Sequence, residues 1–172
     1  MKQLLLLRHA KSSWDDPELS DHDRPLASRG RRAARLLADH LRREALTPEV
    51  VLCSSARRTR ETLERIATAL GDAATFEVEA ELYAASEQRL LERVRALGEE
   101  DDCALLIGHN PGLEQLALSL AGAGDALAAL RRKYPTGALV TLEFDGPWRE
   151  LGPGDAELVD FVTPKQLKKL GG

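Results

Sequence analysis

Residues 2–12 read Lys2-Gln3-Leu4-Leu5-Leu6-Leu7-Arg8-His9-Ala10-Lys11-Ser12. Four consecutive leucines have the length and apolarity of a β-strand that is buried on both of its faces. The apolar run stops abruptly at an arginine, a histidine and a lysine. In an open α/β sheet, ligands bind in the crevice beyond the carboxyl ends of the strands, so we expect Arg8 and His9 at the mouth of a site.

The composition is that of a globular protein with a well-formed core. The chain has 172 residues, of which 43% are hydrophobic and 30% charged, and we predict a single domain over residues 1–172. The formal net charge of -4 gives no general attraction to nucleic acid or to an anionic membrane, so we expect neither as a partner. Any anion must therefore be held by a local cluster of basic side chains.

The sequence favours a cytoplasmic location. No apolar stretch approaches the roughly 20 residues that span a bilayer, and Arg8 interrupts the leucines too early for a secretory signal peptide. Cys53 and Cys103 each lie in an apolar, strand-like run without a second thiol at metal-ligand spacing. We interpret both as small buried side chains.

A buried strand followed by a helix occurs three times. A helix with arginines on its solvent side is predicted over residues 28–43. Residues 50–53 form a second strand that leads through a Ser-Ser step into a helix, and residues 103–107 form a third strand that ends at a histidine. This alternation predicts an α/β fold. The strand ends bring five side chains to one edge of the sheet: Arg8, His9, Ser55, Arg58 and His109.

The other segments carry weaker signals. The polar loop over residues 12–25 either contacts substrate or forms a solvated connection; its candidate contacts are Trp14, Asp21, His22, Asp23 and Arg24. Strands are predicted at residues 76–78, at an edge of the sheet, and at 138–144, and residues 157–162 form a final edge strand or an extended segment. Helices are predicted at 87–97 and within 122–134. We expect the acidic loop 99–102 to be solvated and the lysine-rich tail from Pro164 to be peripheral.

Two imidazoles and two guanidiniums at one sheet edge suit a phosphate group. Each arginine can grip two phosphoryl oxygens through its planar fork, and hydrogen bonds to charged groups contribute roughly 1.5–3 kcal/mol each. A neutral imidazole is a competent nucleophile, so attack of His9 on phosphorus would give a phosphohistidine intermediate. His109 would stabilise the charge on the equatorial phosphoryl oxygens during the transfer. We expect no metal and no other cofactor, because the arginines supply the positive charge.

The same residues resemble those of a known family. The segments Leu7-Arg8-His9-Ala10-Lys11-Ser12, Asp23-Arg24-Pro25-Leu26 with Arg29-Gly30, Ser54-Ser55-Ala56-Arg57-Arg58-Thr59-Arg60-Glu61-Thr62 and Ile107-Gly108-His109-Asn110 are similar to motifs of the histidine phosphatase superfamily, which has a phosphoglycerate mutase-like fold. The chain looks most like the short SixA-type phosphohistidine phosphatases. The likeness runs from residue 1 to about residue 120. Each motif alone is a weak signal, but all of them together, in the expected order, are specific for this family.

The resemblance implies a three-layer α/β/α sandwich with a mainly parallel central sheet. It also implies His9 as the phosphorylated nucleophile, with Arg8, Arg58 and His109 completing the phosphate pocket. Arg58 stands four residues before Thr62, the spacing of the family's arginine, and Arg57 is the alternative. We expect Ser12 and Ser55 to bind substrate as well, since hydroxyls and free backbone N–H groups at a helix start suit an anion.

Two departures from the family bear on the substrate. Ala10 replaces the glycine that usually follows the histidine, which narrows the approach to the phosphate. Larger members carry a carboxylate general acid on a long insertion, for which this chain has little room; Glu81 is the best-placed candidate. An alcohol leaving group needs a proton, whereas the imidazole of phosphohistidine departs more easily. A weak acid therefore favours phosphoramidate substrates.

Three functions are consistent with these residues. The first is a metal-independent phosphatase that dephosphorylates phosphohistidine in a partner protein. The second is a phosphatase for a small phosphomonoester, in which Glu81, Asp21 or Asp23 would serve as the acid. The third is a non-catalytic module that binds phosphate or a phosphoprotein, although such a module would not need the nucleophile. The enzymatic interpretations require that the rings of His9 and His109 meet around one basic cavity.

Overall fold

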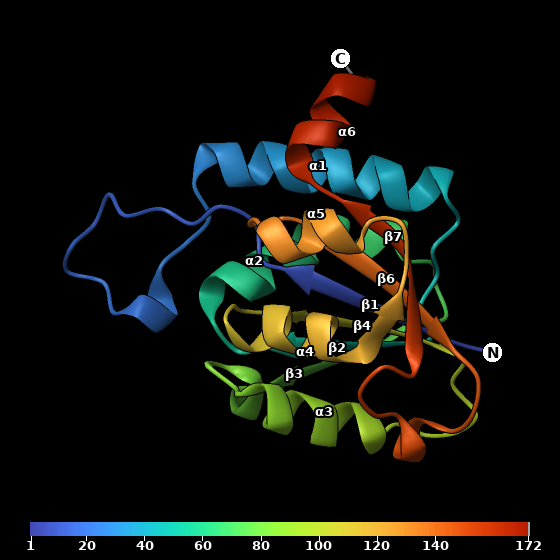
Figure 1. Ribbon diagram of the computed structural model, residues 1–172. Coiled ribbons are helices and arrows are strands. Elements are labelled where there is room, and N and C mark those ends of the chain that lie inside the picture. Colours follow the sequence, from blue (N-terminus) through green and yellow to red (C-terminus); the bar gives the residue numbers. More distant parts are fainter. Residues whose placement is uncertain (172) are drawn as a thin grey trace.

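The computed structural model describes residues 1–171 and forms a seven-stranded sheet between two layers of helices (Figure 1). The strands are β1 (Lys2–Arg8), β2 (Val50–Ser54), β3 (Thr75–Glu79), β4 (Cys103–Gly108), β5 (Ala121–Ala123), β6 (Leu139–Phe144) and β7 (Ala156–Val162). The helices are α1 (Ser28–Arg43), α2 (Arg57–Ile66), α3 (Glu87–Arg95), α4 (Gly112–Leu120), α5 (Leu127–Arg132) and α6 (Pro164–Gly171). Short 3-10 turns are η1 (Asp21–Asp23), η2 (Ala67–Ala69), η3 (Ala80–Leu82) and η4 (Trp148–Glu150).

The strand order is β3-β2-β4-β1-β6-β7-β5. Strand β6 pairs antiparallel with β1 and β7, and all other pairs are parallel. The predicted α/β fold with a mainly parallel sheet between two helical layers is therefore confirmed. No helix within residues 1–171 is both long enough and apolar enough to cross a membrane.

The leucine run explains why β1 lies inside the sheet. Because successive side chains of a strand point to opposite faces, Leu4 and Leu6 pack with α3, α4 and α5, whereas Leu5 and Leu7 pack with α1, α2 and α6. All four leucines are buried. A strand covered on both faces needs apolar residues at every position, and this run supplies them.

The carboxyl-terminal third differs from the sequence predictions. Strand β7 is not an edge strand, because the three-residue strand β5, which the sequence did not indicate, pairs with its outer side. The lysine-rich tail is not merely peripheral: it forms α6, whose buried Leu167 joins the core shared with α1. Outside this third, the acidic loop 99–102 is attached to the start of β1, because the carbonyls of Glu99 and Asp101 accept hydrogen bonds from Lys2 Nζ.

The first turn of α1 packs tightly against the segment that follows β1. A Cβ on Gly30 would lie 2.1 Å from the carbonyl oxygen of Lys11. At a solvent-exposed helix position, a change from glycine to alanine stabilises the folded protein by up to about 1 kcal/mol. At residue 30 the clash with the backbone makes the same change destabilising. We expect Gly30→Ala to lower the free energy of unfolding, measured by urea denaturation, by about 1–3 kcal/mol.

The matched control for this substitution is Gly98→Ala. A Cβ at residue 98 would meet only the carboxylate of exposed Glu100, which can rotate away, so its effect should stay within about 0.5 kcal/mol. Unchanged or increased stability of Gly30→Ala would contradict the tight packing.

Candidate active site

The two imidazoles lie at the carboxyl ends of adjacent parallel strands. Arg8 of β1 is in register with Gly108 of β4, so His9 and His109 leave the sheet side by side. Their ring centroids are 5.2 Å apart with an interplanar angle of 53°. Both side chains are buried. The two rings therefore lie side by side, as the sequence predicts.

The tautomer of His9 follows from its hydrogen bonds. Its Nδ1 lies 2.7 Å from the carbonyl oxygen of Ala10, which can only accept, so Nδ1 carries the proton. Its Nε2 accepts a hydrogen bond of 3.3 Å from Nε of Arg58. The lone pair of His9 therefore faces the guanidinium, which is where a bound phosphoryl group would be drawn.

Arg58 lies between the two histidines. It projects from the first turn of α2, and its Nη2 donates to Nδ1 of His109 at 3.4 Å. Arg57 instead pairs with Glu61 at 2.8 Å on the exposed side of the helix. Of the two arginines left open by the sequence, the structure thus brings Arg58 to the imidazoles.

His109 is oriented by a serine that the sequence analysis did not choose. Because Nδ1 of His109 accepts from Arg58, Nε2 carries the proton and donates to Oγ of Ser54 at 2.7 Å. Ser55 contacts His22 instead, with 2.9 Å between Oγ and Nε2. The hydroxyl of Ser12 is engaged by Arg24. Ser12 and Ser55 therefore support the surrounding loop rather than contact His9, Arg58 or His109.

Arg8 is anchored beside the cluster. Its Nη1 donates to the carbonyl oxygen of Tyr134 at 3.0 Å, and Nδ2 of Asn110 donates to the same oxygen at 3.0 Å. The Nε of Arg8 is buried and has no hydrogen-bond partner within residues 1–171. Leaving a buried N–H without a hydrogen-bond acceptor costs about 1–3 kcal/mol. An oxyanion that accepts from Nε of Arg8 would remove this cost and would itself be stabilised.

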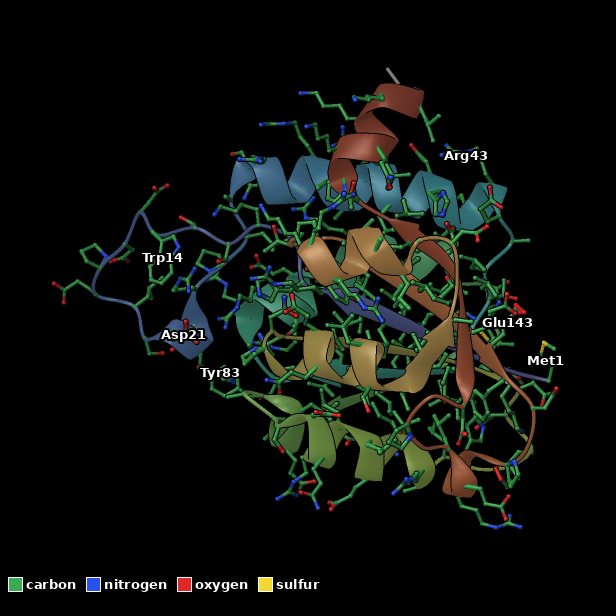
Figure 2. All side chains as sticks on the ribbon, viewed as in Figure 1. Met1, Trp14, Asp21, Arg43, Tyr83 and Glu143 are labelled. Carbon is green, nitrogen blue, oxygen red and sulfur yellow. The ribbon has the colours of Figure 1, made fainter. Side chains whose placement is uncertain are left out.

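A carboxylate reaches the cluster from the loop before α1. Asp21 accepts hydrogen bonds from Arg58, through its carbonyl at 2.7 Å and its carboxylate at 3.1 Å. The same carboxylate accepts from Arg24 at 2.8 Å and from the hydroxyl of Tyr83 at 2.5 Å. Figure 2 shows Asp21 and Tyr83 at the same end of the molecule, with Trp14 farther out on the loop.

Tyr83 was missed by the sequence analysis. Its ring meets those of His22 and His109 edge-on, with centroid distances of 4.8 and 5.5 Å. The strand topology could have indicated it. Because β3 runs parallel to β2, the residues just after β3 lie at the carboxyl ends of the strands, where His9 and His109 also lie. Glu81, the proposed acid in that segment, is exposed and forms no hydrogen bond or ion pair within residues 1–171. Asp21 is the carboxylate at the cluster.

Burial and positive charge keep both imidazoles neutral. Burial, reinforced by the charges of His109, Arg58 and Arg8, lowers the pKa of His9 to about 3. Burial and Arg58 lower the pKa of His109 to about 4. Hydrogen bonds from Tyr83 and Arg58 lower the pKa of Asp21 to about 2, so its carboxylate is ionised.

The loop candidates form a network around this carboxylate. Arg24 is buried and stacks on exposed Trp14, with 3.3 Å between its Cζ and the ring centroid. Asp23 lies 3.5 Å from Nδ1 of His22. Within residues 1–171, no group of three or more His, Cys, Asp or Glu side chains is arranged to hold a metal ion.

The chain is similar in sequence to known proteins. A family model of the histidine phosphatase superfamily (branch 1) matches residues 4–86. An uncharacterized protein of Mycobacterium leprae is 37% identical, over 92% of this chain and 100% of its own length.

Solved structures extend the likeness over the whole fold. A candidate phosphohistidine phosphatase SixA from Nakamurella multipartitia is 31% identical, with a TM-score of 0.82 over 95% of this chain and 96% of that chain. The protein histidine phosphatase SixA in complex with tungstate is 25% identical, with a TM-score of 0.78 over 96% and 99% of the two chains. The chain therefore belongs to the histidine phosphatase superfamily and is of the SixA type.

Proposed function

We propose that this protein is a metal-independent phosphatase that works through a phosphohistidine on His9 and dephosphorylates phosphohistidine in a partner protein. The observation that carries the proposal is the Nε2 lone pair of His9, held beside the buried guanidinium of Arg58 and a second imidazole. Membership of the superfamily supports phosphatase activity. The SixA relative that is complexed with tungstate supports a site for a tetrahedral oxyanion.

In the first step, Nε2 of His9 attacks phosphorus. The new N–P bond forms as the bond to the leaving group breaks, and the electron pair of that bond departs with the leaving group. Arg58 and Arg8 neutralise the phosphoryl oxygens, which is the charge that a metal ion would otherwise supply. The Nδ1–H of His9 keeps donating to Ala10, whose carbonyl stabilises the positive charge that develops on the ring.

In the second step, water attacks phosphorus and the N–P bond to His9 breaks. The electron pair returns to Nε2, and the proton of the water leaves with the phosphate or passes to solvent. A bound phosphate dianion favours protonation of His109 at Nδ1, the nitrogen that accepts from Arg58. The protonated imidazole then donates to a phosphoryl oxygen.

The state of Asp21 favours a phosphoramidate substrate. Its carboxylate is ionised, with a pKa of about 2, so it holds no proton to give to an alkoxide. A phosphohistidine whose second ring nitrogen is protonated leaves as neutral imidazole and needs no such donor. This difference separates the proposal from a phosphatase for alkyl phosphomonoesters.

Removal of the nucleophile tests the mechanism. We expect His9→Ala to lose at least about 10³-fold in kcat toward a phosphohistidine peptide and an aryl phosphate, both measured in EDTA. The wild type should also form an acid-labile, alkali-stable phosphoenzyme that the variant lacks. His40→Gln, which changes a histidine outside the site, is the control and should retain both properties. Substantial turnover by His9→Ala would exclude the phosphohistidine mechanism.

Adjacent arginines provide a matched pair of variants. Arg58→Ala should lower kcat/KM by about 10²–10³-fold because it removes the guanidinium between the imidazoles, whereas Arg57→Ala should change it less than about twofold. Steady-state kinetics on the same phosphohistidine peptide measure both. Equal losses would show that the arginine beside His9 has no special role.

The neutral histidines also set the acid stability. An unfolded histidine binds a proton near pH 6.5, but His9 and His109 remain unprotonated in the folded state until about pH 3 and 4. The unfolded state therefore binds more protons between pH 6 and 5, and stability falls as the pH falls. We expect a slope of up to about 1.4 kcal/mol per pH unit for each histidine.

Urea denaturation at pH 5.0, 5.5 and 6.0 measures this slope. His9→Asn should show a smaller slope than the wild type because one of the two depressed histidines is gone. Identical slopes would mean that His9 titrates normally in the folded protein.

A further inference from the structure

A second basic feature lies outside the cluster around His9. The facing sides of α1 and α6, which cross at the top of Figure 1, enclose a groove of about 550 Å³. Five cationic side chains line it: Arg29, Arg32 and Arg35 from α1, and Lys165 and Lys168 from α6. Both series repeat every three residues, so each helix presents a row of positive charge along one rim.

None of these five exposed cations has a partner within residues 1–171. Their side chains form no hydrogen bond and no ion pair there, and no carboxylate lines the groove. Neighbouring arginines on α1 are engaged, since Arg31 donates to the carbonyl of Leu26 and Arg42 pairs with Asp39. In a chain with 28 acidic and 24 basic residues, this is a local concentration of positive charge against the overall balance.

The groove also has an apolar floor. Ala33, Leu36 and Pro164 line it, and all three are partly exposed. Aliphatic side chains can pack on such a floor while carboxylates reach the cations on the rims. This combination matches an amphipathic segment with one apolar and one acidic face.

Both walls of the groove begin beside the nucleophile. The first turn of α1 contacts the segment after β1, where Gly30 packs on the carbonyl of Lys11. At the start of α6, Cγ of Pro164 lies 2.9 Å from the position of a Cβ on Gly137. The N–H of Gly137 donates to the carbonyls of Arg8 and His9 at 3.0 and 2.9 Å. The two helices that form the groove therefore start against the backbone segments that carry His9.

We propose that the groove between α1 and α6 docks an acidic, amphipathic segment of the phosphohistidine-bearing protein substrate, an inference that rests on the proposed function. Nucleic acid fits less well, because no aromatic side chain lines the groove for base stacking and the net charge of the chain is negative. Docking there raises the local concentration of the phosphoryl group at His9 without contributing to its chemistry.

A binding experiment tests the groove without catalysis. The probe is a fluorescein-labelled helical peptide with leucines on one face and glutamates on the other, titrated at 50 mM and 300 mM salt. We expect binding to the wild type that weakens with salt, and at least about tenfold weaker binding to Arg32→Glu/Lys168→Glu. The control, Arg89→Glu/Arg131→Glu, makes the same charge change on α3 and α5 of the opposite layer and should bind like the wild type.

Two outcomes of this titration would overturn the proposal. One is equal loss of binding in both double variants, which would indicate a non-specific charge effect. The other is tighter binding of a single-stranded oligonucleotide than of the acidic peptide, again lost only in Arg32→Glu/Lys168→Glu, which would assign the groove to nucleic acid.

A kinetic experiment links the groove to the substrate. Two phosphohistidine peptides are compared, identical except that one carries the acidic amphipathic segment and the other a neutral segment of equal length. The wild type should favour the acidic peptide by about tenfold in kcat/KM, through KM. Arg32→Glu/Lys168→Glu should lose this preference and keep its rate on the neutral peptide and on an aryl phosphate.

The two proposals fail in different ways. If the wild type turns over neither peptide, the proposed function is wrong, whatever the titration shows. If it turns over both peptides at equal rates, or if the groove variant keeps the preference, the docking proposal is wrong while the phosphatase remains.

Discussion

The parallel pairing of β1 with β4 is the constraint on which the site depends. Both strands are buried between two helical layers, so their backbone groups must pair with each other and their side chains must be apolar on both faces. Their register puts Arg8 opposite Gly108, and polar residues can begin only where the helical layers stop covering the sheet. Two histidines from distant parts of the chain consequently emerge at the same level.

The electrostatics of the cluster follow from this placement. An imidazolium buried beside Arg58 would be a second positive charge out of water, so both rings stay neutral and each is held in one tautomer by a fixed acceptor, the carbonyl of Ala10 or the hydroxyl of Ser54. Guanidiniums are suited to this position because they remain charged where an imidazole does not. The site thus places the lone pair of a neutral imidazole beside a permanent positive charge.

Much of this arrangement could be predicted from the sequence, and the failures have physical causes. The leucine run and the histidines after two strands are strong local signals. The resemblance to the family's arginine spacing pointed to Arg58, which lies beside both imidazoles. Strand β5 is Ala-Gly-Ala, too short and too small to show any periodicity, and without it β7 looks like an edge. That Ser54 rather than Ser55 contacts His109 depends on which side chain faces the site at the end of β2. That Asp21 rather than Glu81 contacts Arg58 depends on how the long loop before α1 folds. Such details are set by tertiary contacts rather than by local pattern.

The Asp21 carboxylate accepts a hydrogen bond from Arg58, so it would compete with any anion that binds to this guanidinium. An incoming phosphoryl group must replace a carboxylate whose local concentration is high and constant, because the chain itself holds it in place. Under the proposed function, a dianion that also reaches Arg8 would gain more from this exchange than a monoanion. The returning carboxylate would then compete with the inorganic phosphate formed in each cycle.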